Sequence, residues 1–440
     1  MENTYNSLKT VFQNLKKENS KNPSFLFLIL VLWCIPLSYA FNSIALGLLT
    51  AVTLFAFKKS NFKIDATLLL PIGLFLLMGI SLLWTNDLSA STRALLKGLP
   101  LLLIPLTFCM FPRLSKEQKQ KIISFYAYGI VVFTVFYLIK ASIRFLLYHD
   151  SSVFFYHELV TEDVNAIHVS VYVALSVFYF ITKTSKSNLD KIAIVVLSLF
   201  LILLSSKNII VIFLVLIVCY YWRHYQSNNK NRIIKIGAFL FLILVIAFSG
   251  KIKNRFLIEY ESNVTENTVN EDIGTAAEKV YNVSVKKAWT QDQFQKNDFF
   301  PGTAFRVYQI RIFKEMVLED SIWLTGYGLN ATDFKIAEKG KQHNVYEGYW
   351  LKNFHNEYLQ IFAEIGIFGL LLIMTMLFIN IKNALKAKDF IHISFAVLMI
   401  SLFLTESFLC RQRGIVFFAI MYCLLNAKTE EAYPQNKNLL

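Results

Sequence analysis

Most of the chain is a series of long apolar runs separated by short polar connectors. The runs can cross a bilayer as helices, because about twenty apolar residues in an α-helix span the hydrocarbon core. Hydrophobic residues make up 55% of the sequence and the mean hydropathy is +0.47, outside the usual range of soluble proteins. The pattern predicts an all-α polytopic membrane protein with about twelve transmembrane helices, at residues 25–41, 43–57, 66–84, 94–111, 122–147, 166–182, 190–206, 208–222, 233–250, 355–381, 390–408 and 412–426.

One long polar segment, from Lys251 to Phe354, interrupts this series. It contains fourteen Lys or Arg and fourteen Asp or Glu residues and is therefore neutral overall. Helical periodicity predicts an amphipathic helix over residues 276–289 and a second one over residues 303–318. Residues 259–272 are rich in Glu and Asn and predict a solvated stretch. We therefore expect one large, partly helical loop in a protein whose other connections are short.

The formal net charge of +14 is concentrated in the connectors and tails beside the apolar runs. This distribution argues against nucleic acid as a partner. With the N-terminus in the cytoplasm, basic connectors fall in the cytoplasm and acidic ones outside, as the positive-inside rule requires. Both termini are then cytoplasmic, and the large loop lies in the periplasm of a bacterial inner membrane. The predicted organisation is an amphipathic cytoplasmic N-terminus (1–24), spans one to nine (25–250), the periplasmic loop (251–354), spans ten to twelve (355–426) and a cytoplasmic tail (427–440).

Arg306 is the first candidate for chemistry. At helical spacing it shares an apolar stripe with Ile310, Phe313 and Val317, in what we take as the first turn of a helix. A guanidinium there is poorly placed for stability and well suited to bind an anion such as phosphate through its fork. The alternative is that it reaches solvent or pairs with a nearby acid. Arg311 lies about 140° away by the helical period and is a weaker candidate.

His355 is the second candidate, at the point where the loop re-enters the membrane. We expect it in the first turn of the tenth span, where the helix dipole favours a neutral imidazole suited to a general base. The alternative is a His that only makes local hydrogen bonds. Helical spacing puts His355 on one face with Gly366 and Gly369, which would let a neighbouring helix approach. Glu364 lies on the opposite face, and a carboxylate inside an apolar run is usually functional or paired.

Other polar residues are expected at the same membrane surface. Together they would put several cations and a His where a lipid diphosphate head group lies. The sequence gives no metal site, since His343 and His355 lack paired acids or a His-x-x-His spacing, and no Gly-x-Ser-x-Gly of a hydrolase occurs. The additional surface candidates are Lys207 after Ser205-Ser206, His168, Glu406, Arg411 and Arg413.

With these residues in view, the chain resembles the O-antigen ligase and O-antigen polymerase family of bacterial inner-membrane proteins. Three patterns carry the resemblance. They are the helix from Arg306 leading through Trp323-Leu324-Thr325 to Gly326-Tyr327-Gly328, the run His355-Asn356-Glu357-Tyr358-Leu359 with Glu364-x-Gly366-x-x-Gly369, and the turn Ser206-Lys207. At this turn the family typically has Ser-Arg.

The resemblance implies a metal-independent glycosyltransferase of the GT-C kind that uses an undecaprenyl-diphosphate-linked glycan as donor and needs no cofactor. Its other partners would be membrane lipids and an acceptor, either lipid A core or another glycan. On this sequence Arg306 would hold the diphosphate and His355 would activate or orient the acceptor hydroxyl. Lys207, Arg311, Arg411 and Arg413 are further candidates for the diphosphate, and Glu364, Asn356, Glu406 and His168 for support.

Several functions stay open on the sequence alone. Ligation to lipid A core, polymerisation of O-antigen or capsular repeats, and protein O-glycosylation share these motifs, and the size of the loop leans toward ligation. A lipid-linked sugar flippase or other transporter is the rival class, because twelve spans suit it. That class predicts charges deep inside the membrane and an inverted repeat. A structural or binding protein without glycan chemistry is the third class.

Overall fold

The computed structural model describes residues 2–160, 164–223, 250–265, 268–270, 273 and 279–430 of the chain, and these are mostly helical. The helices before residue 224 are α1 (Glu2–Lys21), α2 (Phe25–Cys34), α3 (Tyr39–Phe55), α4 (Ala66–Ile80), α5 (Leu88–Gly98), α6 (Pro100–Met110), α7 (Lys116–Tyr148), α8 (Tyr156–Leu159), α9 (Ala166–Thr182), α10 (Asn188–Leu203) and α11 (Lys207–Arg223). The later elements are α13 (Gly250–Val264), β1 (Tyr281–Asn282), α14 (Val285–Thr290), β2 (Asp298–Phe299), α15 (Gly302–Asp320), α16 (Asp333–Gln342), α17 (Glu357–Ala387), α18 (Phe390–Phe403) and α19 (Gln412–Asn426).

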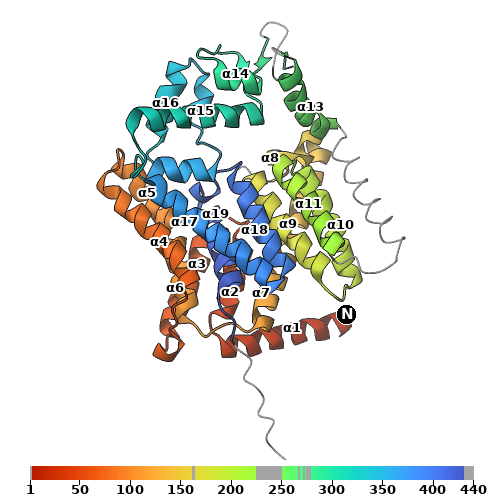
Figure 1. The fold of residues 1–440 in the computed structure, drawn as a ribbon. Coiled ribbons are helices and arrows are strands. Elements are labelled where there is room, and N and C mark those ends of the chain that lie inside the picture. Colours follow the sequence, from red (N-terminus) through yellow and green to blue (C-terminus); the bar gives the residue numbers. More distant parts are fainter. Residues whose placement is uncertain are drawn as a thin grey trace, which may run out of the picture.

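The apolar helices pack side by side into one bundle, which contains the larger hydrophobic core (Figure 1). By length and composition, four stretches within the described residues can cross a membrane: Ala66–Leu83, Leu88–Met110, Lys116–Tyr148 and Glu357–Ala387. Five shorter apolar helices lie among them. The chain is therefore an all-α protein of membrane type, and the count of twelve spans stays a prediction. The span expected at 233–250 lies almost wholly outside the described residues.

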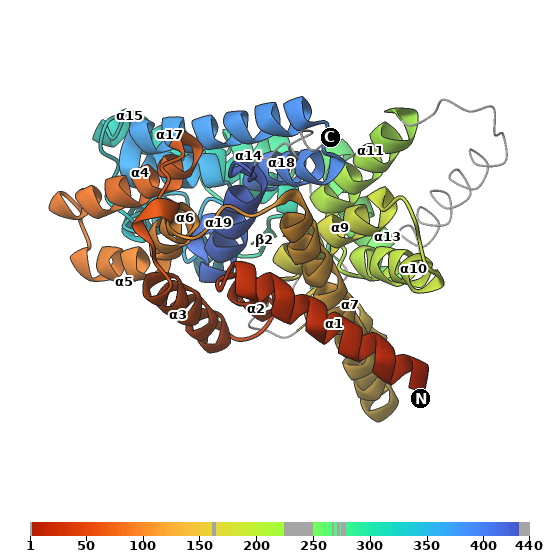
Figure 2. The same cartoon turned by 90° about the horizontal axis from the view of Figure 1, so that it is seen from below.

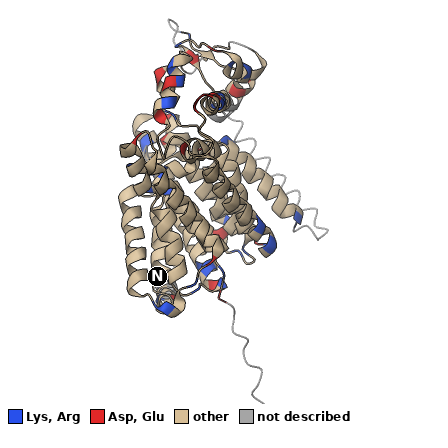
Figure 3. Cartoon of the chain, turned by 60° about the vertical axis from the view of Figure 1, so that its left-hand side comes forward, with Lys and Arg blue, Asp and Glu red and all other residues tan. Residues whose placement is uncertain are grey.

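Charged residues gather at the two ends of the bundle and beyond its upper end, while the helices between have few of them (Figure 3). Such a distribution keeps charges out of the hydrocarbon layer. Helix α1 runs across the lower end of the bundle, as Figures 1 and 2 both show. There Glu18 pairs with Lys121 of α7 at 2.6 Å. The orientation of the bundle in the membrane stays a prediction.

The described part of residues 250–354, which we call the cap, covers the upper end of the bundle (Figure 1). The cap has a hydrophobic core of its own, which includes Phe300, Tyr308 and Ile312 and continues onto Phe362 of α17. Helix α15 lies close to the bounds expected for a helix at 303–318. Helix α16 was not predicted. The cap is thus a packed unit that rests on the bundle.

The helix expected over residues 276–289 is wrong for the described part of that range. Tyr281 and Asn282 form β1, which pairs in parallel with β2, and α14 covers only Val285–Thr290. The reason is a local cap: the Ser284 side chain accepts a hydrogen bond from the Lys287 amide and so begins the helix there. Residues 276–278 lie outside the described residues.

Helix α17 is interrupted near its start, and a loop of the cap supplies hydrogen-bond partners to the main-chain groups at the interruption. Ile365 and Gly366 leave the helical conformation, with φ/ψ of −131/19° and 70/−167°. Buried main-chain groups need partners, so an interrupted helix must find them elsewhere. The partners come from residues 323–328, through hydrogen bonds of 2.8 Å from Tyr327 N to Ala363 O, from Gly328 N to Glu364 O and from Ile367 N to Trp323 O.

Gly366 is required at this break for two reasons. Its φ of 70° lies in the left-handed region, and a Cβ at this position would lie 2.2 Å from the carbonyl oxygen of Leu324. Gly366 therefore admits the backbone of a loop, and the expected approach of a neighbouring helix is wrong at this residue. Because the helix is interrupted here, His355 and Gly366 also do not share one continuous helical face.

Candidate functional site

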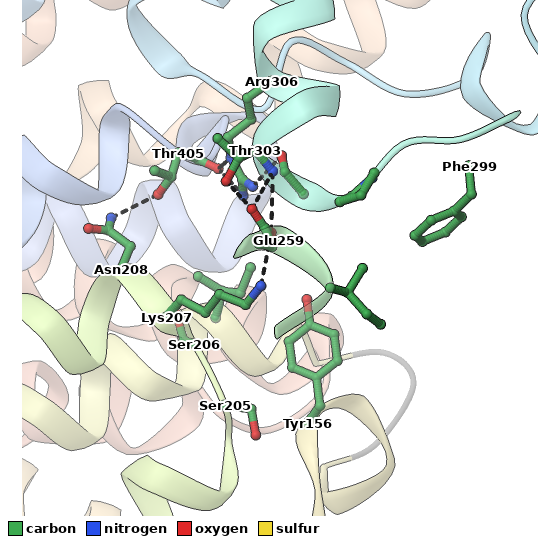
Figure 4. A pocket seen from close by; sticks show the side chains of 14 residues that line it. Tyr156, Ser205, Ser206, Lys207, Asn208, Glu259, Phe299, Thr303, Arg306 and Thr405 are labelled. Atoms are coloured by element: carbon green, nitrogen blue, oxygen red, sulfur yellow. Dashed lines mark hydrogen bonds and ion pairs between the residues drawn. The ribbon is translucent and has the colours of Figure 1, made fainter. Parts of the chain in front are cut away.

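A cavity of about 460 Å³ opens between the cap and the upper end of the bundle. It lies where the start of α11, helix α13, the start of α15 and the end of α18 come together (Figure 4). Its size is within the range of small-molecule binding sites. The residues that line it are Tyr156, Ile167, Ser205, Ser206, Lys207, Asn208, Ile258, Glu259, Phe299, Pro301, Gly302, Thr303, Arg306 and Thr405.

Lys207 reaches the cavity from the first residue of α11. Next to it, Asn208 donates hydrogen bonds to Ser401 O at 2.9 Å and to Thr405 Oγ1 at 2.8 Å. These bonds tie the start of α11 to the end of α18. Lys207 and Thr405 thus line the same cavity, and the carbonyl of Thr405 is the acceptor of the second predicted cation, Arg306.

Arg306 lies in the second turn of α15, which begins at Gly302, so the expectation of a first-turn position is slightly wrong. Its Nε and Nη2 donate to Thr405 O at 3.0 and 2.8 Å, and its Nη1 donates to Gly302 O at 3.0 Å. Nη2 also lies 3.3 Å from Oε1 of Glu406. Thr405 follows α18, which ends at Phe403, so its carbonyl lies outside the helix and can accept from this cation. Arg306 both lines the cavity and pairs with an acid.

Glu406 connects the two principal candidates. It is buried, with Oε1 at 3.3 Å from Arg306 and Oε2 at 3.3 Å from Nδ1 of His355. Burial opposes ionisation, but the hydrogen bond from His355 and the charge of Arg306 outweigh it and hold the pKa of Glu406 below its ordinary value. A charged carboxylate thus bridges Arg306 and His355, which are 49 positions apart in sequence.

His355 is not in the first turn of α17, and that expectation is wrong. It precedes Asn356, which caps the helix by accepting a bond from Leu359 N at 3.1 Å, and it has a left-handed φ of 46°. Asn356 also donates to Leu404 O at 3.2 Å, which holds His355 beside Glu406 at the end of α18. With Nδ1–H given to Glu406, the imidazole would present Nε2 as its basic nitrogen. His355 is outside the cavity lining and joins it through Glu406 and Arg306.

Glu259 is a site residue that sequence reasoning missed, because residues 259–272 were expected to be solvated. Its carboxylate lies 2.9 Å from Lys207 Nζ and accepts hydrogen bonds from the amide and the hydroxyl of Thr303. Burial raises its pKa, but the bonds from Lys207 and Thr303 prevail and the pKa is lowered overall. Its polar neighbours in sequence hid it, and no local signal points to a partner 52 positions away.

Arg311 and Arg413 are not brought to the cavity. Arg311 lies inside the cap and binds Asp292 at 2.6 Å and Glu315 at 2.9 Å. Arg413 is buried in the bundle, where Nε and Nη2 donate to the carbonyl of Leu37 at 3.0 and 2.6 Å. Both guanidinium groups therefore have structural partners away from Lys207.

The remaining candidates surround the site without lining the cavity. Arg411 is exposed at the start of α19, and His168 is buried with its ring centroid 4.4 Å from that of Phe408. Glu364 is buried at the break of α17, where its Oε1 accepts a bond of 2.6 Å from Gln360. Of the two sequence interpretations of Glu364, the paired one describes its surroundings.

The arrangement is suited to binding an anion. Two helices of 17 and 19 residues, α11 and α15, begin at the cavity, and helix N-termini carry partial positive charge. Lys207 and Arg306 add full charges. Within the described part of the chain, no group of three or more His, Cys, Asp or Glu side chains is placed to hold a metal ion. Metal independence itself stays a prediction.

Residues 192–374 match the family model described as O-antigen ligase. The match includes α11, the whole cap and the first part of α17 with its break, and so contains Lys207, Glu259, Arg306 and His355. Glu406 lies beyond it. No curated protein matches the chain.

Proposed function

We propose, from the match of residues 192–374 to the O-antigen ligase family model, that the protein moves a glycan from an undecaprenyl-diphosphate donor to an acceptor at the outer face of the membrane. The family match supports glycosyltransferase activity of the O-antigen ligase or polymerase type in a bacterial membrane. The observation that carries the proposal is the Glu406 bridge, which joins a phosphate-binding cation to a candidate base.

In the proposed reaction Arg306 and Lys207 bind the diphosphate in the cavity, with the N-termini of α11 and α15. The acceptor hydroxyl oxygen bonds to the anomeric carbon as the bond from that carbon to the diphosphate oxygen breaks. The electron pair leaves with the diphosphate, whose growing charge the fixed cations stabilise. His355 takes the hydroxyl proton at Nε2, and Glu406 stabilises the imidazolium that forms.

Ligation to lipid A core remains the preferred reaction, with repeat polymerisation and protein glycosylation as alternatives. A transporter is less well supported, because the charged groups of the cavity lie at helix ends and in the cap instead of deep within the bundle. Deleting the gene and examining surface polysaccharide on gels separates the first two reactions. Loss of ligation leaves lipid-linked polymer, whereas loss of polymerisation leaves single-repeat products.

The His355→Ala variant tests the proposal directly. We expect glycan transfer in isolated membranes to fall about 10²- to 10⁴-fold, the usual contribution of a general base. The matched control is His149→Ala, since His149 is also a left-handed, non-glycine position (φ 51°) and is exposed at the end of α7. Full transfer by a normally inserted His355→Ala protein would contradict the proposal.

A further inference from the structure

The carboxylate of Glu259 makes the contacts that a bound phosphate oxygen would make. It forms an ion pair with Lys207 at 2.9 Å. It also accepts hydrogen bonds from the amide of Thr303, at 3.2 and 3.3 Å, and from the Thr303 hydroxyl. Thr303 is the second residue of α15, where an unsatisfied amide is available for an anion. An acid from α13 thus occupies the anion-binding end of α15.

This position is also the meeting point of the two cations of the cavity. A Cβ added to Gly302 would lie 3.0 Å from Oε1 of Glu259 and 3.2 Å from Nη1 of Arg306, so both side chains converge on the bare backbone of this glycine. Figure 4 shows Lys207 and Thr303 on the same carboxylate, with Arg306 beside them. Any phosphate that used Lys207 and the start of α15 would have to take the place of this carboxylate.

Charge and burial show which carboxylate can give way. Glu406 is buried and holds two partners, so removing it would leave Arg306 and His355 uncompensated. The Glu259 side chain is partly exposed, at 17%, and the next residues of α13, Tyr260 and Glu261, are exposed. Its side chain can turn toward solvent without unpacking a core.

We propose that Glu259 is a tethered substitute for a donor phosphate, which leaves Lys207 and Thr303 when the donor diphosphate arrives. The naming of the anion as the diphosphate of a lipid-linked donor rests on the proposed function. Displacement also confers selectivity, because a ligand must outcompete a carboxylate already in place. A diphosphate has two charged groups, so it can bind Lys207 and Arg306 at once and displace the carboxylate. A single phosphate can replace only the contacts that Glu259 makes with Lys207 and Thr303.

The test is anion binding by the full-length protein in lipid nanodiscs. Inorganic pyrophosphate is titrated into the wild type and into Glu259→Gln, which keeps an acceptor for Thr303 but loses the charge. If Glu259 holds the position about nine-tenths of the time, its removal tightens pyrophosphate binding about tenfold. Glu261→Gln, two residues along the same helix, is the matched control and should bind like the wild type. Inorganic phosphate should bind measurably only to Glu259→Gln.

Two further arms make the outcome decisive. Undecaprenyl diphosphate in the nanodisc should show the same gain, and a gain for free pyrophosphate alone would overturn the assignment to the donor. Glu259→Asp, with a shorter reach, should give an intermediate gain and serves if the Gln variant does not fold. Equal binding by all variants would overturn the proposal. Because these are binding measurements, a gain without any glycan transfer would support the displacement while contradicting the proposed function.

Discussion

Two groups of charged residues lie within the upper part of the molecule and differ in where their members come from. One, inside the cap, joins Arg311, Glu315, Asp292, His343 and Lys339. All five lie between positions 292 and 343. The other, which we call the seam cluster, consists of Lys207, Glu259, Arg306, His355 and Glu406 and extends from position 207 to position 406. The first links parts of one unit, and the second links two units around a cavity.

The comparison teaches that ion pairing alone does not identify a functional arginine. Arg306 and Arg311 lie on the same helix, and both have acidic partners. Buried or partly buried pairs contribute little net stability on average, so their presence says little about purpose. Glu315 joins Arg311 to His343 just as Glu406 joins Arg306 to His355. What distinguishes Arg306 is that its guanidinium borders open space.

The largest expected contrast is between Arg306→Lys and Arg311→Lys. Lysine keeps the charge but loses the planar fork, so the first variant should lower the rate of glycan transfer about 10²- to 10³-fold with the thermal midpoint nearly unchanged. The second should lower the midpoint while transfer per folded molecule is retained. Transfer assays and thermal unfolding in detergent measure both. Equal losses of transfer in the two variants would contradict the assignment of different roles to the cap group and the seam cluster.

The contact that aligns the cap with the bundle gives the next largest effect. Gly366→Ala forces a left-handed residue to carry a Cβ that meets the Leu324 carbonyl, and we expect about 2–3 kcal/mol of destabilisation. Gly47→Ala is the control, because a Cβ at that position in α3 has no neighbour within 4 Å and should be neutral or slightly stabilising. Protease sensitivity of the cap, together with the thermal midpoint, reports the change. A Gly366→Ala protein as stable as Gly47→Ala would refute the assigned contact.

The smallest expected effect is a pH dependence confined to the seam cluster. The pKa of Glu259 in the folded protein lies below its ordinary value of 4.5, so the stability from its ion pair is present above pH 4.5 and is lost as the pH falls through the lowered pKa. Wild type should therefore exceed Glu259→Gln by about 0.5–1 kcal/mol at pH 7, and the difference should shrink by pH 4. Unfolding curves at both pH values test this. A difference that grows on acidification would reverse the assigned sign.

Local signals in the sequence were sufficient for some of these features and were misread for others. Helical phase separated Arg306 from Arg311, and the two do face different surroundings. The position of His355 outside its helix was also readable, since Asn356, followed by Glu357 and an apolar run, is a helix-start signal. Ser284 carried the same kind of signal for α14. These boundary errors came from giving apolar periodicity more weight than capping residues.

Other features depend on contacts that no local pattern encodes. The approach of Glu259 to Lys207 and of Arg306 to Thr405 requires the relative placement of four helices, α11, α13, α15 and α18, which tertiary packing decides. The break of α17 is another case, because Gly366 signals close approach but does not say whether a helix or a loop approaches. Long apolar runs, by contrast, leave few choices of structure, and the all-α membrane class followed from them.

The main-chain bonds between residues 323–328 and 363–367 have a consequence for engineering. They use backbone atoms, so many side-chain exchanges in either stretch leave them intact, but a single insertion or deletion shifts the register and breaks all three. A chimera that receives the cap of a related protein should therefore take both stretches from one parent. Its junctions should be placed before Gly250 and after Ile367, so that residues 323–328 and 363–367 come from the same parent.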